Sequence, residues 1–295
     1  IQERPIIFLH IFKLFMQESR TIKSLLNVRV NFIFYFITLV VSFFSRKIFL
    51  EGLGDDFIGL TGTLNNILGL INMAELGIGT AVGFTLYKPL FDKDKDQINE
   101  IISVFGYLYN RIGLFILLIA CIISVFLPTI FNTTELPLSI IYFAYYSFLA
   151  SSLFSYFINY RQILLGADQK NYVVTGYYQS SLLIKNIIQL AICAYSKNYY
   201  IWISIELAFG ILYSFILNWK INQVYPWLSS NIKLGSKLLK KYPNIVVKAK
   251  HIFFQRIAYT ILTQTTQPII YAYSSLQMVT FYGNYTLIIE KIASL

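Results

Sequence analysis

Three ionisable residues interrupt long apolar stretches of the sequence: Glu75, Arg111 and Lys185. At a rise of 1.5 Å per residue, each lies about 15 to 20 Å from the near end of its stretch, around the middle of a bilayer. A charge at that depth is costly and normally faces a wet, functional interior. Because guanidinium and ammonium groups bind phosphate, we expect Arg111 and Lys185 to contact an anion, with Glu75 balancing the charge or carrying a proton.

The same residue types also allow structural interpretations. Glu75 can pair with Arg111 or Lys185 and simply hold two helices together. Arg46 and Lys47 lie nearer the outer end of the first apolar stretch. There they either receive the same anion or extend to the membrane interface.

In the apolar stretches before residue 220, the four basic residues Arg46, Lys47, Arg111 and Lys185 outnumber the two acidic residues, Glu75 and Glu206. This balance favours an anionic substrate, such as one bearing phosphate, over an organic cation. We therefore predict a substrate-binding cavity lined by Arg46, Lys47, Glu75, Arg111 and Lys185.

A second polar patch, Gln264–Thr265–Thr266–Gln267, comes directly before Pro268 in another apolar stretch. Proline removes a helix hydrogen bond, and broken helices at membrane depth are tolerated where they face protein or water. Together with Glu75, the residues Gln264, Gln267 and Pro268 predict a hinge or coupling site. The alternative is a kinked helix whose polar groups are satisfied internally.

Long apolar helices must position these residues. Hydrophobic residues make up 56% of the chain and charged residues 13%, against about 25% charged in an average soluble domain. Because about 20 apolar residues cross a bilayer, we expect an all-α, polytopic membrane helical bundle. The predicted spans are residues 30–50, 57–86, 101–127, 138–160, 172–195, 200–219, 252–273 and 276–295.

The second predicted span, residues 57–86, is rich in small and polar residues. Small residues let helices approach closely in lipid, and Gly79 and Gly83 form a GxxxG pair. We expect this segment to pack against its neighbouring helices and to line a hydrated space. Its small and polar residues are Gly59, Gly62, Asn65, Asn66, Gly69, Asn72, Gly77, Gly79, Thr80 and Gly83.

One connection is much longer than the others and marks a boundary between two bundles. The predicted organisation is an interfacial segment (1–29), a complete six-helix bundle (30–222), a basic connection (223–251) and two helices of a second bundle (252–295). The chain begins without Met and stops within an apolar stretch. We therefore expect the second bundle to be truncated here.

Positive charge falls mainly on one side of the predicted membrane. Of the 24 Lys and Arg residues, eighteen lie in the N-terminal segment, the long connection and two short connections on that side, and three lie opposite. By the positive-inside rule, the N-terminus is cytoplasmic. This bias accounts for the net charge of +10, and we expect no nucleic-acid partner.

Motifs of soluble enzymes and metal sites do not occur in the sequence. Cys121 and Cys193 are far apart in apolar stretches, and His10 and His251 lack ligand-like spacing. The glycines around Gly77 do not complete a dinucleotide-binding motif. We expect a transporter with no catalytic residue, bound metal or resident cofactor.

A series of short motifs carries a family likeness from about Thr21 to the end. The motifs are Gly59–Leu60, Ala74–Glu75–Leu76–Gly77–Ile78–Gly79, Tyr87–Lys88–Pro89, Asn159–Tyr160–Arg161, Ala167–Asp168–Gln169–Lys170, Asn222 with Tyr225–Pro226, and Tyr282–Gly283–Asn284–Tyr285. With them the chain resembles Wzx-type oligosaccharide (polysaccharide) flippases of the multidrug/oligosaccharidyl-lipid/polysaccharide exporter superfamily.

The resemblance implies a MATE-like fold, with two six-helix bundles facing each other in a V around a central cavity. It implies that undecaprenyl-diphosphate-linked oligosaccharide units cross the bacterial inner membrane by alternating access. Such units serve lipopolysaccharide O-antigen, capsule or exopolysaccharide assembly. Proton or sodium coupling and other polysaccharide assembly proteins as partners belong to the same expectation.

Two other functions stay open on the sequence. The first is a cation-coupled multidrug or small-molecule antiporter of the same superfamily. The second is a membrane polysaccharide polymerase or ligase, which usually has a large periplasmic loop with catalytic Arg or His residues. The predicted outer connections are short and hold no His, which argues against the second.

Overall fold

The computed structural model describes residues 20–293, with side chains to residue 290, and this part of the chain contains helices and no strand. Residues 20–293 form eleven α-helices, and the 3-10 helices η1, η2 and η3 join α3 to α4, α6 to α7 and α9 to α10. In chain order the elements are α2 (Arg20–Leu53), α3 (Asp55–Ile71), η1 (Asn72–Glu75), α4 (Ile78–Asp92), α5 (Lys95–Ile130), α6 (Leu138–Phe157), η2 (Asn159–Gln162), α7 (Ile163–Ala167), α8 (Asn171–Tyr195), α9 (Tyr199–Val224), η3 (Ile232–Leu234), α10 (Gly235–Leu239), α11 (Pro243–Tyr273) and α12 (Leu276–Ala293).

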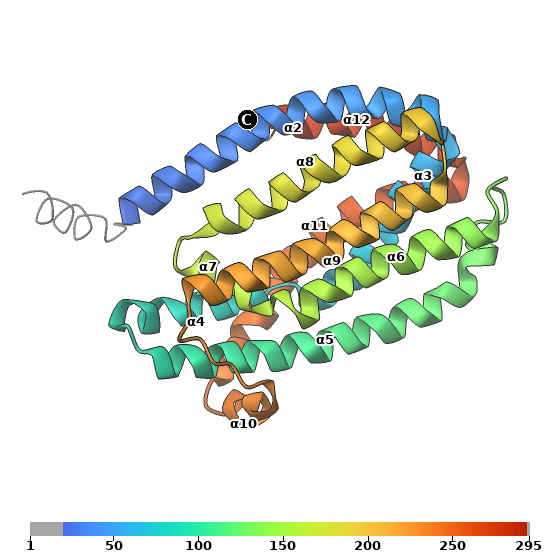
Figure 1. Ribbon diagram of the computed structural model, residues 1–295. Coiled ribbons are helices and arrows are strands. Elements are labelled where there is room, and N and C mark those ends of the chain that lie inside the picture. Colours follow the sequence, from blue (N-terminus) through green and yellow to red (C-terminus); the bar gives the residue numbers. More distant parts are fainter. Residues whose placement is uncertain (1–19, 294–295) are drawn as a thin grey trace, which may run out of the picture.

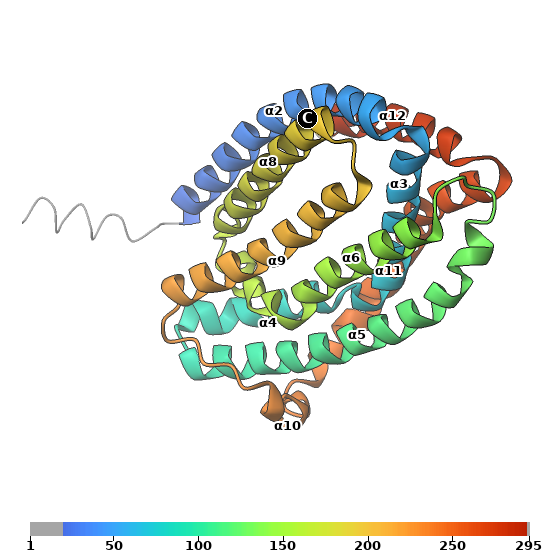
Figure 2. The same cartoon turned by 45° about the vertical axis from the view of Figure 1, so that its right-hand side comes forward.

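The long helices lie side by side. Across the molecule they follow the order α2, α8, α9, α6 and α5, with each packed on the next (Figures 1 and 2). The helices α3 and α4 pack against α11, and α12 packs against α3. The end of α12 also runs beside α2, so the last described helix lies next to the first (Figure 1).

Five of these helical segments are long and apolar enough to cross a membrane, judged by length and composition. They are Arg20–Leu53, Asp55–Glu75, Lys95–Ile130, Leu138–Phe157 and Tyr199–Val224. The other predicted spans are also helical, as α8, α11 and α12, but they are less apolar. Exposed aromatic and aliphatic side chains on α2, among them Phe32, Phe36 and Phe43, form a surface suited to lipid. An all-helical membrane bundle is thus supported.

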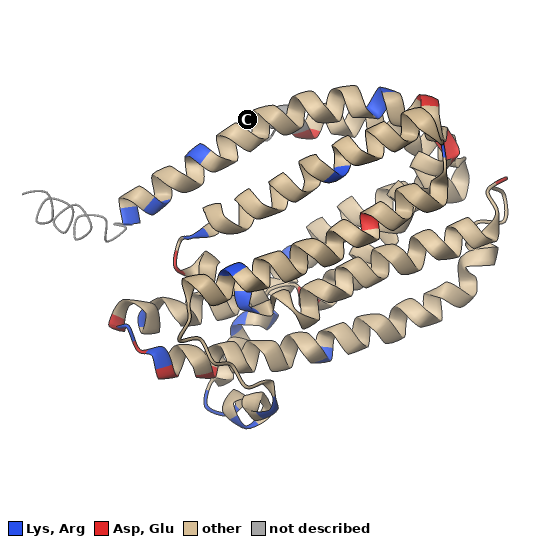
Figure 3. Ribbon diagram, viewed as in Figure 1, with Lys and Arg blue, Asp and Glu red and all other residues tan. Residues whose placement is uncertain are grey.

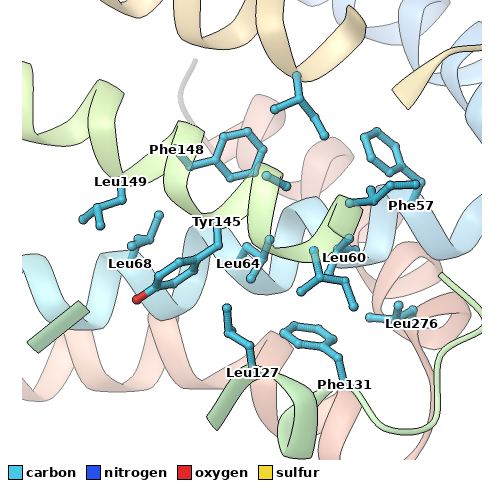
Figure 4. Packing of buried hydrophobic residues seen from close by; sticks show 14 of the residues in the cluster. Phe57, Leu60, Leu64, Leu68, Leu127, Phe131, Tyr145, Phe148, Leu149 and Leu276 are labelled. Carbon is cyan, nitrogen blue, oxygen red and sulfur yellow. The ribbon is translucent and has the colours of Figure 1, made fainter. Parts of the chain in front are cut away.

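Buried apolar side chains form two clusters that fix the central helices. The larger cluster joins α3, α5 and α6 (Figure 4). Its labelled members from α3 are Phe57, Leu60, Leu64 and Leu68, those from α5 and its end are Leu127 and Phe131, and those from α6 are Tyr145, Phe148 and Leu149. The Tyr145 hydroxyl donates to the carbonyl of Ala120 (2.8 Å), so this buried phenol is satisfied. The second cluster joins α4, α5 and α9 around Leu86, Ile101 and Leu217.

The predicted span 57–86 is a discontinuous helix. After α3 the chain makes the 3-10 turn η1, and Gly77 then takes a left-handed conformation (φ 91°) before α4 begins. By contrast, α11 continues through Pro268 to Tyr273, so of the two alternatives at Pro268 the structure has the uninterrupted helix. A proline near a helix end removes one ladder hydrogen bond, and the remaining bonds keep the helix intact.

Close helix approaches occur at glycines other than the GxxxG pair. A Cβ on Gly62 would lie 2.5 Å from Gln267 Oε1, and one on Gly77 would lie 2.5 Å from the carbonyl oxygen of Ala249. A Cβ on Gly79 or Gly83 would meet its nearest neighbours at 3.5 Å or more. The tight contact therefore joins the discontinuous helix to α11.

Most Lys and Arg residues lie at one end of the molecule, which we call the basic end (Figure 3). It comprises the start of α2, the α4–α5 and α7–α8 turns and the connection from α9 to α11 (Figure 3). This connection folds against α5, where the Asn231 N–H donates to Ser103 Oγ (2.8 Å) and Lys241 pairs with Glu100 (2.6 Å). Pro243 starts α11, as proline favours a first helical position, so this helix begins before the predicted residue 252.

Asp168 ties three elements together at the basic end. Its carboxylate accepts hydrogen bonds from Lys23 of α2 (2.6 Å) and from the Tyr225 hydroxyl after α9 (2.8 Å), and it pairs with Lys170 (3.0 Å). Burial alone would raise the pKa of Asp168, but these donors outweigh burial and hold the pKa below its ordinary value.

The substitution Asp168→Asn is expected to lower the unfolding free energy by about 1–2 kcal/mol at pH 7, because charged hydrogen bonds are lost. Since the native pKa lies below the unfolded value of about 3.9, this contribution is full above that pH and disappears as the pH falls through the native pKa. Thermal unfolding in detergent at pH 7 and pH 3 measures it. Asp92→Asn, an exposed carboxylate at the same end, is the control, and a pH-independent gap for Asp168→Asn would contradict the prediction.

Candidate functional site

A polar cavity of about 560 Å³ lies where α2, α3, α11 and α12 meet. We call it the Arg46 cavity. Its volume is in the range of small-molecule sites, which run from about 300 to 1,000 Å³. Two predicted residues, Arg46 and Gln267, lie together in it. The polar lining side chains are Arg46, Thr61, Asn65, Gln267, Thr280, Thr286 and Glu290.

The Arg46 guanidinium is positioned by α12. Its Nε donates to Asn284 Oδ1 (2.6 Å) and its Nη2 donates to the carbonyl of Thr280 (3.2 Å). A Cβ on Gly283 would come 3.2 Å from Nη2, so the glycine leaves room for the planar group. Because a guanidinium has five N–H donors, it can hold these two bonds and still bind a phosphate in the cavity.

The opposite pair of helices, α3 and α11, supplies amides to the cavity. Gln267 Oε1 is buried and has no hydrogen-bond partner within the described residues. Asn65 donates its amide nitrogen to the carbonyl of Thr61 (2.9 Å). Gln264, one turn before Gln267, lies against Gly69 and outside the cavity lining. The predicted polar patch is therefore split, with one glutamine facing the cavity.

Glu75 lies at the break in the discontinuous helix. The hydroxyls of Tyr156 on α6 and Tyr109 on α5 interact with its carboxylate through hydrogen bonds. Next to it, Asn72 donates to Ser152 Oγ of α6 (3.3 Å). Glu75 is thus held by tyrosines, and neither Arg111 nor Lys185 is its partner.

Lys185 is buried and forms an ion pair with Glu206 (2.5 Å), which also accepts a hydrogen bond from Gln189 (3.1 Å). The pair lies in a separate cavity of about 260 Å³ between α6, α8 and α9, where Asn159 and Tyr178 are among the lining residues. Because Glu206 neutralises the ammonium group, Lys185 does not offer a free charge to an anion.

Arg111 and Lys47 lie on the outside of the helices. Arg111 is exposed, with Cζ 5.5 Å from the ring centroid of Tyr107 on the same helix. Lys47 is exposed and faces Glu51 one turn later (3.8 Å). The expectation that Glu75, Arg111 and Lys185 meet in one passage is wrong, because equal depth along a helix does not set which face a side chain occupies.

Comparison with known proteins assigns this chain to no family. The chain matches no protein-family model, no curated protein and no solved structure among those with which it was compared. Among the described residues, no group of three or more His, Cys, Asp and Glu side chains is placed to hold a metal ion. The chemistry of the Arg46 cavity and the sequence resemblance are therefore the basis for the functional proposal.

Proposed function

We propose that this protein is a transporter that moves an anionic, lipid-linked oligosaccharide across the bacterial inner membrane by alternating access. The proposed cargo is an undecaprenyl-diphosphate-linked repeat unit for surface polysaccharide, and the proposed architecture is a MATE-like pair of bundles. The single observation that supports it best is the Arg46 cavity. It combines one guanidinium for phosphate with amides and hydroxyls for sugar.

An apolar groove next to the cavity suits a lipid tail. The groove, about 380 Å³ in volume, lies between α2 and α12 and is lined by Val40, Phe43, Phe44 and Ile288 among others. Leu287 lines both the groove and the Arg46 cavity. A ligand with a polar head and a long apolar tail can therefore occupy both at once.

The helix break at residues 72–77 suits the required movement. Broken helices in transporters occur where backbone lines protein or water, and here α11 packs tightly on the break at Gly77. We propose that the break is the hinge about which α11 and α12 move relative to α5 and α6. Glu75 at this break is the proposed carrier of a coupling proton.

The test is replacement of Arg46 in a strain whose own copy of the gene is deleted. Arg46→Gln is expected to reduce export of surface polysaccharide at least tenfold, because a charged hydrogen bond to phosphate contributes about 1.5–3 kcal/mol. Lipid-linked oligosaccharide should accumulate in the cytoplasmic leaflet. Lys47→Gln, the exposed neighbour, is the matched control. Normal export by Arg46→Gln at equal protein levels would contradict the proposal.

A further inference from the structure

A second polar pocket, about 620 Å³ in volume, lies at the basic end between the start of α2, the end of α4 and the turn that joins α7 to α8. We call it the Arg20 pocket. Its charged lining residues are three cations and one anion, Arg20, Lys23, Lys93 and Asp168. The Arg20 pocket shares no lining residue with the Arg46 cavity, so the two are separate sites.

One side of the Arg20 pocket is a hydrogen-bonded joint between α2 and the α7–α8 turn. Lys23 Nζ donates to the carboxylate (2.6 Å) and to the carbonyl (3.0 Å) of Asp168. One turn later on α2, the Asn27 amide nitrogen donates to the carbonyl of Gln169 (2.8 Å). Because Lys23 and Lys170 both pair with Asp168, the joint carries no net negative charge that would repel an anion.

Arg20 and Lys93 are the cations of the pocket that remain available to a ligand. Both residues are exposed, and within residues 20–293 neither has an ion-pair partner. The carboxylates next to Lys93 in the sequence, Asp92 and Asp94, do not line the pocket. Two unpaired cations from different helices favour an anion, and phosphate oxygens can accept hydrogen bonds from both.

An exposed aromatic stripe on α4 extends along the helix from the Arg20 pocket. Tyr87 and Phe91 line the pocket, and the ring centroid of Phe84 lies 5.8 Å from that of Tyr87. Phe84, Tyr87 and Phe91 are 50%, 52% and 75% exposed. Their spacing places them on one face of α4, over about 10 Å of helix. A small soluble anion would leave this stripe uncovered, whereas the acyl chain of a lipid would cover it.

The length of α2 allows the Arg20 pocket to lie in a headgroup layer of the membrane. From Arg20 to Arg46 the helix rises about 39 Å, close to the full thickness of a bilayer with its headgroups, about 40–45 Å. Basic pockets between membrane helices are suited to anionic lipid headgroups. We propose that the Arg20 pocket binds an anionic phospholipid, with the phosphate at Arg20 and Lys93 and an acyl chain along the aromatic stripe. The inference does not depend on the proposed cargo.

Lipid binding to the purified full chain in a neutral detergent tests the site. The probes are phosphatidylglycerol and phosphatidylcholine with the same acyl chains, and native mass spectrometry measures how much of each is bound. The wild type is expected to prefer phosphatidylglycerol. Arg20→Gln or Lys93→Gln should weaken its binding about fivefold, and the double variant about thirtyfold. Binding of phosphatidylcholine should not change.

The matched control is the double variant Arg29→Gln with Lys88→Gln, which also removes one arginine of α2 and one lysine of α4. Both residues are exposed and lie outside the pocket lining. The control should bind phosphatidylglycerol as the wild type does. An equal loss in the two double variants would show that only diffuse surface charge is involved and would overturn the site. Wild-type binding by the Arg20→Gln, Lys93→Gln variant would overturn it as well.

Two competitors identify the source of the phosphate. Inorganic phosphate has no acyl chain, and a short-chain prenyl diphosphate represents the head of the proposed cargo. Neither should displace phosphatidylglycerol from the wild type when supplied at equal concentration. Displacement by inorganic phosphate would make the pocket a site for a free anion, and displacement by the prenyl diphosphate would make it a cargo site. Either result would overturn the assignment to a phospholipid.

Discussion

Lys185→Met is expected to destabilise the protein by about 3 kcal/mol, because it leaves Glu206 partly buried without its cation. The ion pair is short (2.5 Å), and the side chains are 10% and 26% exposed. Gln189 remains as a neutral donor to the carboxylate (3.1 Å), which offsets only part of the loss. Thermal unfolding in detergent measures the effect as a lower midpoint, with reduced protein in the membrane as its consequence.

The double substitution of Lys185→Met with Glu206→Leu is expected to recover most of that stability. Replacing both members of a buried pair by apolar residues is often close to neutral, whereas removing one is not. The double variant also separates two roles for Lys185. If the pair holds α8 to α9, the double variant exports polysaccharide. If Lys185 binds diphosphate, as the sequence suggested, export is lost although the protein is stable. If Lys185→Met alone were as stable as the wild type, the structural role of the ion pair would be refuted.

The pattern of apolar residues predicted the helices well because it depends on local periodicity and length. Within residues 20–293, every predicted span is helical, and five helical segments are long and apolar enough to cross a membrane; residues 294–295 of the last predicted span lie outside the described residues. The excess of basic residues on one side of the predicted topology corresponds to one end of the structure (Figure 3). Of the small and polar residues of α3 from which a hydrated neighbouring space was predicted, Gly62 and Asn65 line the Arg46 cavity.

The side-chain partners were not predictable in the same way. Arg111 precedes Gly113, which belongs to the buried stripe of α5, and a two-residue offset turns a helical side chain to about the opposite face. Lys185 of α8 forms an ion pair with Glu206 of α9, and Arg46 of α2 donates a hydrogen bond to Asn284 of α12. These pairings depend on which helices are neighbours, and sequence spacing alone does not determine that.

The helix break at Gly77 was also not predictable from the sequence, because it depends on tertiary packing. Residues 72–77 are as apolar as their surroundings apart from Asn72 and Glu75, so their periodicity is compatible with a continuous helix. The left-handed conformation of Gly77 and its contact with α11 come from tertiary packing. Pro268 gave the stronger local signal for a break, yet α11 continues through it to Tyr273.

Gly77→Ala is expected to lower the unfolding free energy by about 2–4 kcal/mol and to reduce export strongly. A non-glycine residue at φ 91° is strained by about 1–2 kcal/mol. The added Cβ would also lie 2.5 Å from the carbonyl oxygen of Ala249 and 2.9 Å from Cβ of Ile252, so α11 must move away from the break. Thermal unfolding and the export assay together measure the loss.

Gly79→Ala is the matched control, because it adds the same methyl group two residues further along the chain. Gly79 lies in α4, and its added Cβ would meet the Tyr109 hydroxyl at an ordinary 3.5 Å. Alanine is also the better helix former there, so stability should stay equal or rise slightly and export should continue. If Gly77→Ala behaved like this control, the left-handed turn would not be required, and the hinge would have to lie elsewhere than beside Glu75.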